Sequence, residues 1–459
     1  MAKGAHIIHR VVLNIEVSGR GMAKSAENAV KSYFEQVLLK RIEEILDSID
    51  TNSHLLIDKM DLDLGRIILK DDVPVGLEEK LIEAFQSVAI DLESPRDNTD
   101  EAAFTRLTEP QKAFKTFVYL LENGRLPWYA LPVLQNEDAW LDAIYEVLKE
   151  DITAKNELLK LISKPVVLGR LFAQFRRNNI KQLVSLLMDL AIVDIDRVID
   201  QQVKLYVADE AIITAETFAF FEKIVLLIYL RSADRQIMAL PHLQKQLNYI
   251  PYQPQNLVID DLKIVDALLS TEIEIKRSNI SDNKTPGDQE AQADGIFVSQ
   301  AGLVILHPFL EYFFKDFGLI QNDDFVDIHA RQLGVHLLHY LATGQTNAFE
   351  YDLHFEKFFC CWPADTVIER VVDIPQLMRD EADNMLLAVI RHWRALKNTS
   401  PGGLRESFLS RNGKLIESEN PVRLIIEKKD MDVLLATLPW GIGVVKRPWM
   451  REPFYVEWQ

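Results

Sequence analysis

Three histidines, His329, His336 and His339, have the most evident capacity for chemistry in this chain. They lie in a segment of helical periodicity, where a spacing of seven puts His329 and His336 on one face and His339 follows His336 by three residues. Grouped imidazoles can bind zinc. However, the His-Glu-x-x-His order is absent and no Cys-x-x-Cys pair accompanies it. The pattern therefore favours structural or partly exposed histidines, and a metal-dependent enzyme stays open as an alternative.

Two further segments superficially resemble chemical motifs. Residues 58–65 are rich in aspartate, but they lack the Asp-x-Asp-x-Asp-Gly spacing and the closing glutamate of a calcium loop, and their alternation predicts a half-exposed strand. The run Ser400-Pro401-Gly402-Gly403 is not the Gly-x-Ser-x-Gly turn of a nucleophilic serine. The sequence thus predicts no catalytic residue, no cofactor and no metal ligand, and we expect a protein that is not an enzyme.

Composition restricts the classes of partner. The chain has 459 residues, of which 48% are hydrophobic, and a formal net charge of −18. Such an acidic chain disfavours generic binding to nucleic acid or to anionic membranes and favours a basic partner. Its two cysteines are adjacent, Cys360 and Cys361, which indicates core thiols in a reducing compartment. No segment is long and apolar enough for a membrane span, so we expect no membrane insertion.

The first part of the chain, residues 1–93, alternates two kinds of pattern. Residues 7–17 and 54–64 have strand-like alternation, whereas residues 23–48 and 77–92 have helical spacing. This order predicts a small α/β domain. Because two strands alone are marginally stable, we expect them to pair with strands elsewhere in the chain or in a partner.

Residues 94–275 are predicted to be helical after a polar stretch at 94–104. Short polar breaks between the helices predict a bundle or an irregular solenoid. Residues 276–295 contain almost no large apolar side chain, which predicts a flexible linker. The expected helices are at 108–122, 137–150, 154–162, 165–176, 179–190, 194–206, 214–232 and 258–271.

Residues 296–459 mix helical and strand patterns and predict an α+β module. The fold class expected for the whole chain is therefore mainly α, with a small N-terminal α/β domain and a mixed C-terminal module. The helices expected in this module are at 303–317, 325–342, 352–361, 364–369, 374–396 and 429–436. The expected strands are at 413–416, 422–427, 442–446 and 454–458.

The C-terminal tail concentrates tryptophan and basic residues within an acidic chain. Such rings are either core anchors or a docking surface, because Trp and Arg are enriched at the centres of protein interfaces. We expect the tail to pack on its own module through Trp440 and Trp458 and to present Lys446, Arg447 and Trp449 to a partner. The complete set of candidate partner-binding residues is Trp440, Lys446, Arg447, Trp449, Arg451 and Trp458.

Several motifs resemble the tape measure protein family of extracellular contractile injection systems, the phage-tail-like particles that include antifeeding prophages. At the N-terminal end the similar residues are His9-Arg10, Ile57-Asp58 and Leu62–Gly65. At the C-terminal end they are Gly302–Leu310, Phe317–Leu319, Val335–Gly344, Ser400–Arg405, Phe408–Gly413, Leu438–Trp440, Lys446–Met450 and Val456–Trp458. This resemblance implies a structural component concerned with tube length or tube assembly, without catalytic residues.

The resemblance also implies partners and a place of action: tube, cap or baseplate proteins, and the cytoplasm during assembly, with retention in the released particle left open. Even one unbroken helix of all 459 residues would span only about 690 Å. Prolines shorten that reach, so a folded assembly factor or an adaptor at one end of the tube fits the chain better than an extended ruler. A helical scaffold outside such particles is the alternative.

Overall fold

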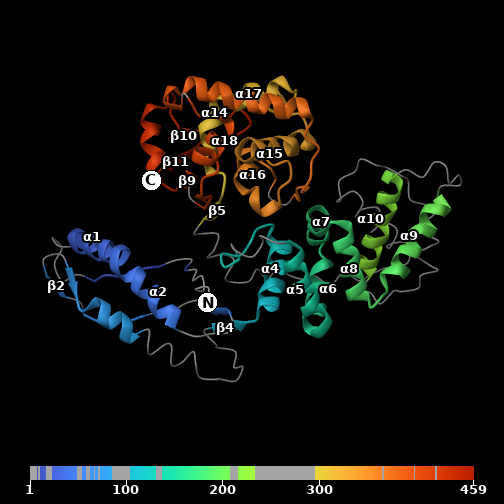
Figure 1. Ribbon diagram of the computed structural model, residues 1–459, viewed down its shortest axis with the longest axis horizontal. Coiled ribbons are helices and arrows are strands. Elements are labelled where there is room, and N and C mark those ends of the chain that lie inside the picture. Colours follow the sequence, from blue (N-terminus) through green and yellow to red (C-terminus); the bar gives the residue numbers. More distant parts are fainter. Residues whose placement is uncertain are drawn as a thin grey trace. The chain divides into compact units, whose positions relative to one another are not determined.

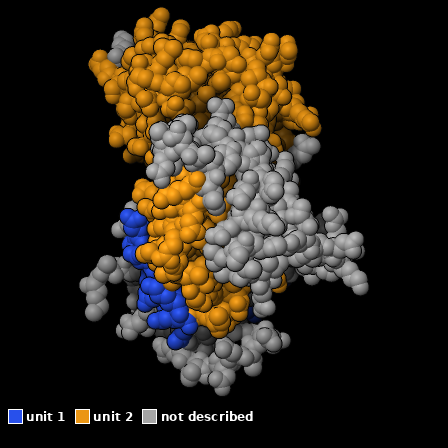
Figure 2. Space-filling view, turned by 90° about the vertical axis from the view of Figure 1, so that its right-hand side faces the viewer, with its two compact units in different colours: residues 1–117, 126–150 blue, residues 118–125, 151–459 orange. Residues whose placement is uncertain are grey.

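The computed structural model describes two compact units, which are coloured separately in Figure 2. One unit comprises residues 1–117 and 126–150, and the other comprises residues 118–125 and 151–459. The residues whose structure is described are 8, 11–16, 23–48, 54–57, 62–66, 68–70, 73–84, 104–130, 137–206, 215–232, 295–363, 366–396, 398–418 and 421–458.

The first unit contains a helical segment that packs against a second helix. The segment runs through α1 (Ala23–Tyr33), a π-helical turn at Phe34–Leu38 and α2 (Leu39–Ser48). Its apolar residues recur at helical spacing and bury Leu38 and Ile42 against Leu77 and Leu81 of the helix at 77–84. The helix expected at 77–92 is therefore present in its first part, while residues 85–92 lie outside the described residues.

The strands of this unit form two small antiparallel ladders. Strand β1 (His54–Ile57) pairs with β4 (Phe104–Leu107), so that His54 faces Leu107 and Ile57 faces Phe104. Strand β2 (Ile68–Lys70) pairs with β3 (Val73–Val75). The strand expected at 7–17 is absent where it is described, because Ile8 and residues 11–16 carry no strand hydrogen bonds and are exposed to solvent.

The helices of the middle region begin and end close to their predicted positions. The expected start at Thr108 is a capping box, because the Thr108 amide donates to Gln111 Oε1 and the Gln111 amide donates to Thr108 Oγ1. The elements are α4 (Glu109–Asn123), α5 (Glu137–Glu150), α6 (Ile152–Ile162), α7 (Pro165–Gln174), α8 (Arg177–Met188), α9 (Ile192–Tyr206) and α10 (Ala215–Ser232). The helix expected at 258–271 and the linker at 276–294 lie outside the described residues.

Helices α8, α9 and α10 pack against one another and share one half-buried cation. Lys181 of α8 donates to Asp196 of α9 at 2.7 Å and contacts Glu222 of α10 at 2.9 Å. Apolar side chains such as Ile180, Ile195 and Ile224 are buried on the facing sides. Antiparallel neighbours of this kind are what short polar breaks between helices predict.

The C-terminal module has a five-stranded sheet in the order β10-β11-β9-β8-β5; Figure 1 labels four of its strands, β5, β9, β10 and β11. Neighbouring strands are antiparallel except β11 and β9, which are parallel. The strands are β5 (Ile296–Val298), β8 (Gly413–Ile416), β9 (Arg423–Ile426), β10 (Val444–Val445) and β11 (Phe454–Trp458). Inward residues such as Leu415, Leu424 and Phe454 are buried, as the period of two requires.

Helical elements cover the inner side of this sheet and complete one apolar core. A 3-10 turn at Ala301–Leu306 leads into α14 (His307–Asp316), and α15 (Ile328–Thr343) is buried over most of its length. The remaining elements are β6 (Ile320–Gln321), β7 (Asp324–Phe325), short helices at Glu350–Asp352 and Arg394–Leu396, α16 (His354–Phe359), α17 (Gln376–His392), α18 (Pro401–Leu404), a π-helical turn at Arg405–Leu409 and η9 (Asp430–Thr437). The chain is thus mainly helical with a mixed C-terminal sheet module, as the sequence predicts.

Candidate functional site

The C-terminal tail begins at Leu438, and two of its side chains hydrogen-bond to the first residues of the C-terminal module. The indole nitrogen of Trp440 donates to the carbonyl oxygen of Ile305 at 3.0 Å, and its ring packs edge-on against Phe309. Arg447 donates to the carbonyl oxygen of His307 at 2.8 Å. Burial lowers the pKa of Arg447, while nearby Glu311 raises it. Both side chains are half-buried, so they act as anchors of the tail.

Trp449 lies in the core, and not on the surface where we expected it to face a partner. Its side chain is only 6% exposed, and its ring contacts Phe314 and Phe325. Its indole nitrogen donates to the carbonyl oxygen of Phe359 at 2.8 Å. A large ring with one polar atom is buried favourably when that atom finds an acceptor, which explains the placement.

Trp458 closes a buried ionic cluster at the other end of the tail. The fully buried Arg411 donates to Asp432 at 2.6 Å, and the amide of Lys429 and the indole of Trp458 donate to the second carboxylate oxygen of Asp432. The buried carboxylate therefore has both a charge partner and hydrogen-bond donors. Sequence reasoning missed this pair, although Arg411 stands in one of the quoted motifs.

Lys446 and Arg451 are exposed, so two of the six expected binding residues stand free for contact with a partner. In the sequence, Lys446 follows an uncharged stretch that sequence reasoning did not single out. Residues 433–445 contain no charged side chain, and Val433 and Val444 are 75% and 53% exposed. Met431, which the buried Asp432 separates from this run, is 48% exposed. We call the exposed side chains of Met431, Val433, Val444, Lys446 and Arg451 the tail surface.

Several C-terminal motifs that carry the family resemblance contact other parts of the module or cap one of its helices. A Cβ atom on Gly302 would lie 1.7 Å from the carbonyl oxygen of Phe408, so only glycine permits this approach of the two backbones. Ser400 caps α18 by accepting from the Gly403 amide at 3.1 Å. Arg405 donates to the carbonyl oxygen of Leu341 at 3.2 Å. The motifs are therefore packing and capping residues.

The second unit contains a buried ionic cluster that no sequence motif indicated. Glu350 is 1% exposed and accepts from Arg170 of α7 and from Lys357 of α16, both at 2.8 Å. Gln174 accepts from the Glu350 amide and donates to the carbonyl oxygen of Ile368. These bonds join α7 to residues 350–368 within one compact unit. The sequence signal that could have indicated this cluster is the pair of polar residues, Arg170 and Gln174, in the otherwise apolar helix α7.

The three histidines are not brought together as metal ligands. His329 is exposed, whereas His336 and His339 are buried. His336 bonds to the carbonyl oxygen of Glu369, and burial lowers its pKa to about 4. His339 Nδ1 lies 3.3 Å from Oε1 of Glu356. Among the described residues, no group of three His, Cys, Asp or Glu side chains is placed to hold a metal ion.

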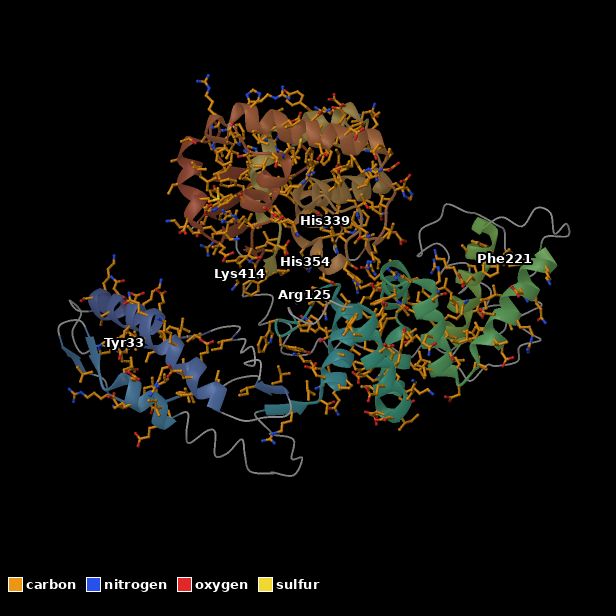
Figure 3. The ribbon with its side chains drawn as sticks, in the orientation of Figure 1. Tyr33, Arg125, Phe221, His339, His354 and Lys414 are labelled. Atoms are coloured by element: carbon orange, nitrogen blue, oxygen red, sulfur yellow. The ribbon has the colours of Figure 1, made fainter. Side chains whose placement is uncertain are left out.

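Another histidine, His354, is half-buried and lies close to charged residues of the second unit. Burial, together with the charges of Lys357, Arg125 and Arg170, lowers its pKa to about 3. Figure 3 shows His354 and His339 on neighbouring elements of the C-terminal module. The lowered pKa keeps the His354 imidazole neutral at pH 7, so it adds no charge beside these cations.

These features describe a structural protein: a module with one apolar core and exposed residues on its tail. The model of the contractile injection system tape measure protein family matches residues 5–458. The chain therefore belongs to this family, and it has a structural or assembly role among the components of a contractile particle. No curated protein and no solved structure matched the chain. None of the described helices is long and apolar enough to cross a membrane.

Proposed function

We propose that this chain acts as a folded adaptor at one end of the tube, and that its tail surface binds a tube, cap or baseplate protein. The observation that carries the proposal is the exposure of Val433 and Val444 in a run without charges, beside the exposed Lys446 and Arg451. Apolar residues at the centre of a patch with charges at its rim are characteristic of protein interfaces.

The tail surface is held rigidly by the residues beneath it. Trp440 and Arg447 donate to backbone oxygens of residues 301–307. The indoles of Trp449 and Trp458 donate to the Phe359 carbonyl oxygen and to the Asp432 carboxylate. A surface that is ordered before binding loses less conformational entropy when the partner arrives. The four anchors therefore support binding indirectly, while Lys446 and Arg451 meet the partner.

The lengths of the helices support a folded adaptor rather than an extended ruler. Among the described helices none exceeds the 18 residues of α10, which corresponds to roughly 27 Å. Helices α8, α9 and α10 pack against one another, so the lengths of these described helices do not add up to reach.

The charge of the chain supports a protein partner. Its net charge of −18 opposes nucleic acid, and the exposed cations of the tail surface suit an acidic patch on the partner. The proposal involves no catalytic step and no cofactor. It places the chain in the cytoplasm while particles assemble, with retention in the released particle as the open alternative.

Co-purification of tagged full-length chain with the particle proteins tests the proposal. Val433→Asp places a charge in the apolar part of the tail surface and should lower recovery of the partner about tenfold or more. Lys446→Glu should weaken recovery less and should reduce its sensitivity to salt, because a rim charge mainly affects encounter. Leu377→Asp is the matched control, since Leu377 is 65% exposed on α17, outside the tail surface.

Each variant is first checked for native circular dichroism. Wild-type recovery with folded Val433→Asp, or an equal loss with Leu377→Asp, would show that the tail surface is not the binding site.

A further inference from the structure

The N-terminal segment, the described residues between 8 and 16, exposes five large apolar side chains to solvent. Its described apolar side chains are Ile8, Val11, Val12, Leu13 and Ile15, exposed by 47%, 45%, 59%, 41% and 40%. None of them belongs to a helix or strand. Exposed β-branched residues that could pair as a strand favour association, and folded proteins usually cover them.

The sequence of this segment is that of a strand with two different faces. From Val12 onward, Leu13 and Ile15 alternate with Asn14 and Glu16. A strand of this pattern buries one face and leaves the other in water. Residues 12–16 therefore have the sequence pattern of a strand, but no described strand pairs with them.

An incomplete sheet lies in the same unit. Strand β1 pairs only with β4 among the described strands, over four residue pairs. A two-stranded ladder is marginally stable in water, and a third strand normally completes it. Leu56 and Ile57 of β1 are half-buried, so this ladder still has apolar surface to cover.

Charge favours an approach of the segment to β1. Residues 1–24 contain four basic side chains and a single acidic one: Lys3, Arg10, Arg20, Lys24 and Glu16. Residues 43–63, which surround β1, contain seven acidic side chains and one lysine: Glu43, Glu44, Asp47, Asp50, Asp58, Asp61, Asp63 and Lys59. The two stretches attract each other, whereas two copies of either one repel.

We propose that residues 11–16 add as a third strand to β1 in a second copy of this chain, at the edge that no described strand occupies. The pairing is between copies because, within one chain, residues 11–16 are described and are not paired with β1. Each copy gives one strand and receives one, which closes a two-fold dimer. Backbone hydrogen bonds would provide the pairing, and Leu13 with Ile15 would cover the apolar side of the ladder.

The test measures the dimer dissociation constant of purified full-length chain by sedimentation over a range of concentrations. Leu13→Ser with Ile15→Ser removes two apolar side chains from the pairing face and should weaken dimerisation about a hundredfold. Asn14→Ser with Glu16→Gln changes the opposite face and is the matched control, for which the constant should change less than about twofold. Added salt should also weaken the dimer.

A second measurement separates strand pairing from other contacts. Hydrogen exchange of the amides at residues 11–16 should be slow in the dimer and fast in Asn14→Pro, which lacks one amide donor. A monomer at all concentrations overturns the proposal, whether those amides are protected, as pairing within one chain requires, or unprotected. A dimer that both double variants leave unchanged also overturns it. The tail-surface variants leave this dimer intact, so its failure and the failure of the adaptor proposal are distinguishable.

Discussion

The N-terminal segment and the C-terminal tail are both short, apolar stretches, yet the chain treats them in opposite ways. In the tail, Trp440, Trp449 and Trp458 each find a hydrogen-bond acceptor and a packed surrounding. In the N-terminal segment, Val12 is 59% exposed and Leu13 is 41% exposed. The difference teaches that stretches of similar apolar content can either pack into a core or stay exposed as a surface for association. Only the contacts of each side chain distinguish the two cases.

The largest expected effect is at the centre of the tail. Trp449→Ala should lower the free energy of unfolding of the C-terminal module by about 3–5 kcal/mol, because it empties a buried site and leaves the Phe359 carbonyl oxygen without its donor. Hydrogen exchange of the buried strands in full-length chain measures the loss. A change below about 1 kcal/mol would contradict a core role.

A smaller effect separates buried from exposed histidine on α15. Burial lowers the pKa of His336 to about 4 from 6.5, so the unfolded chain binds the proton more tightly. The stability that neutral His336 supports is therefore present above pH 6.5 and declines as pH falls toward 4, by up to ~3 kcal/mol.

His336→Gln should reduce this acid sensitivity, whereas His329→Gln, at an exposed position, should not. Urea unfolding of both variants at pH 7 and pH 4.5 gives the comparison. Identical pH dependence in wild type and His336→Gln would exclude His336 as its source. Neither variant should block particle assembly.

Ser400 tests whether a quoted motif acts through capping. Ser400→Ala removes the acceptor of the Gly403 amide and should lower the stability of the module by about 1 kcal/mol. Ser400→Asp retains an acceptor and should restore most of that loss. Thermal unfolding of the two variants decides the matter, and equal destabilisation by both would mean that the hydroxyl is needed for something other than the cap.

The smallest change in the free energy of unfolding is expected for a substitution in the N-terminal segment, when the protein is dilute enough to be monomeric. Leu13→Ser should change the free energy of unfolding by less than about 0.5 kcal/mol, because its side chain is already exposed. Denaturant unfolding at low protein concentration measures it. A loss comparable to that of Trp449→Ala would remove the contrast between the two regions.

Periodicity in the sequence predicted the helices well. Residues 137–150 were expected to be helical and form α5 with the same bounds, since the local pattern and the cap signals agree. Strands β8 and β11 were also placed correctly. Six of the described strands were missed: β2, β3 and β5 have only three residues each, β4 has four, and β6 with β7 forms a ladder of two pairs. Segments this short carry too little period to recognise.

The helix expected at 364–369 is wrong where it is described, because residues 366–369 have no helical structure. Tertiary hydrogen bonds determine this stretch: Thr366 accepts from the Trp362 indole and Ile368 from Gln174. The ion-pair partners of Arg411 and Arg170 could not be predicted from the sequence either, because ion pairs between distant residues leave no local pattern. The proposed division into 1–93, 94–275, 276–295 and 296–459 stays a prediction.

The position of β11 in the sheet has a consequence for biosynthesis. Of the strands in the five-stranded sheet, β11 is the last to be translated, yet it lies between β10 and β9. The ribosome must therefore release residues 454–458 before the sheet can close and before Trp458 can reach Asp432. A chain that lacks residues 454–458 would leave β9 and β10 without the strand between them and Asp432 without its indole donor, so the module forms only once β11 is available.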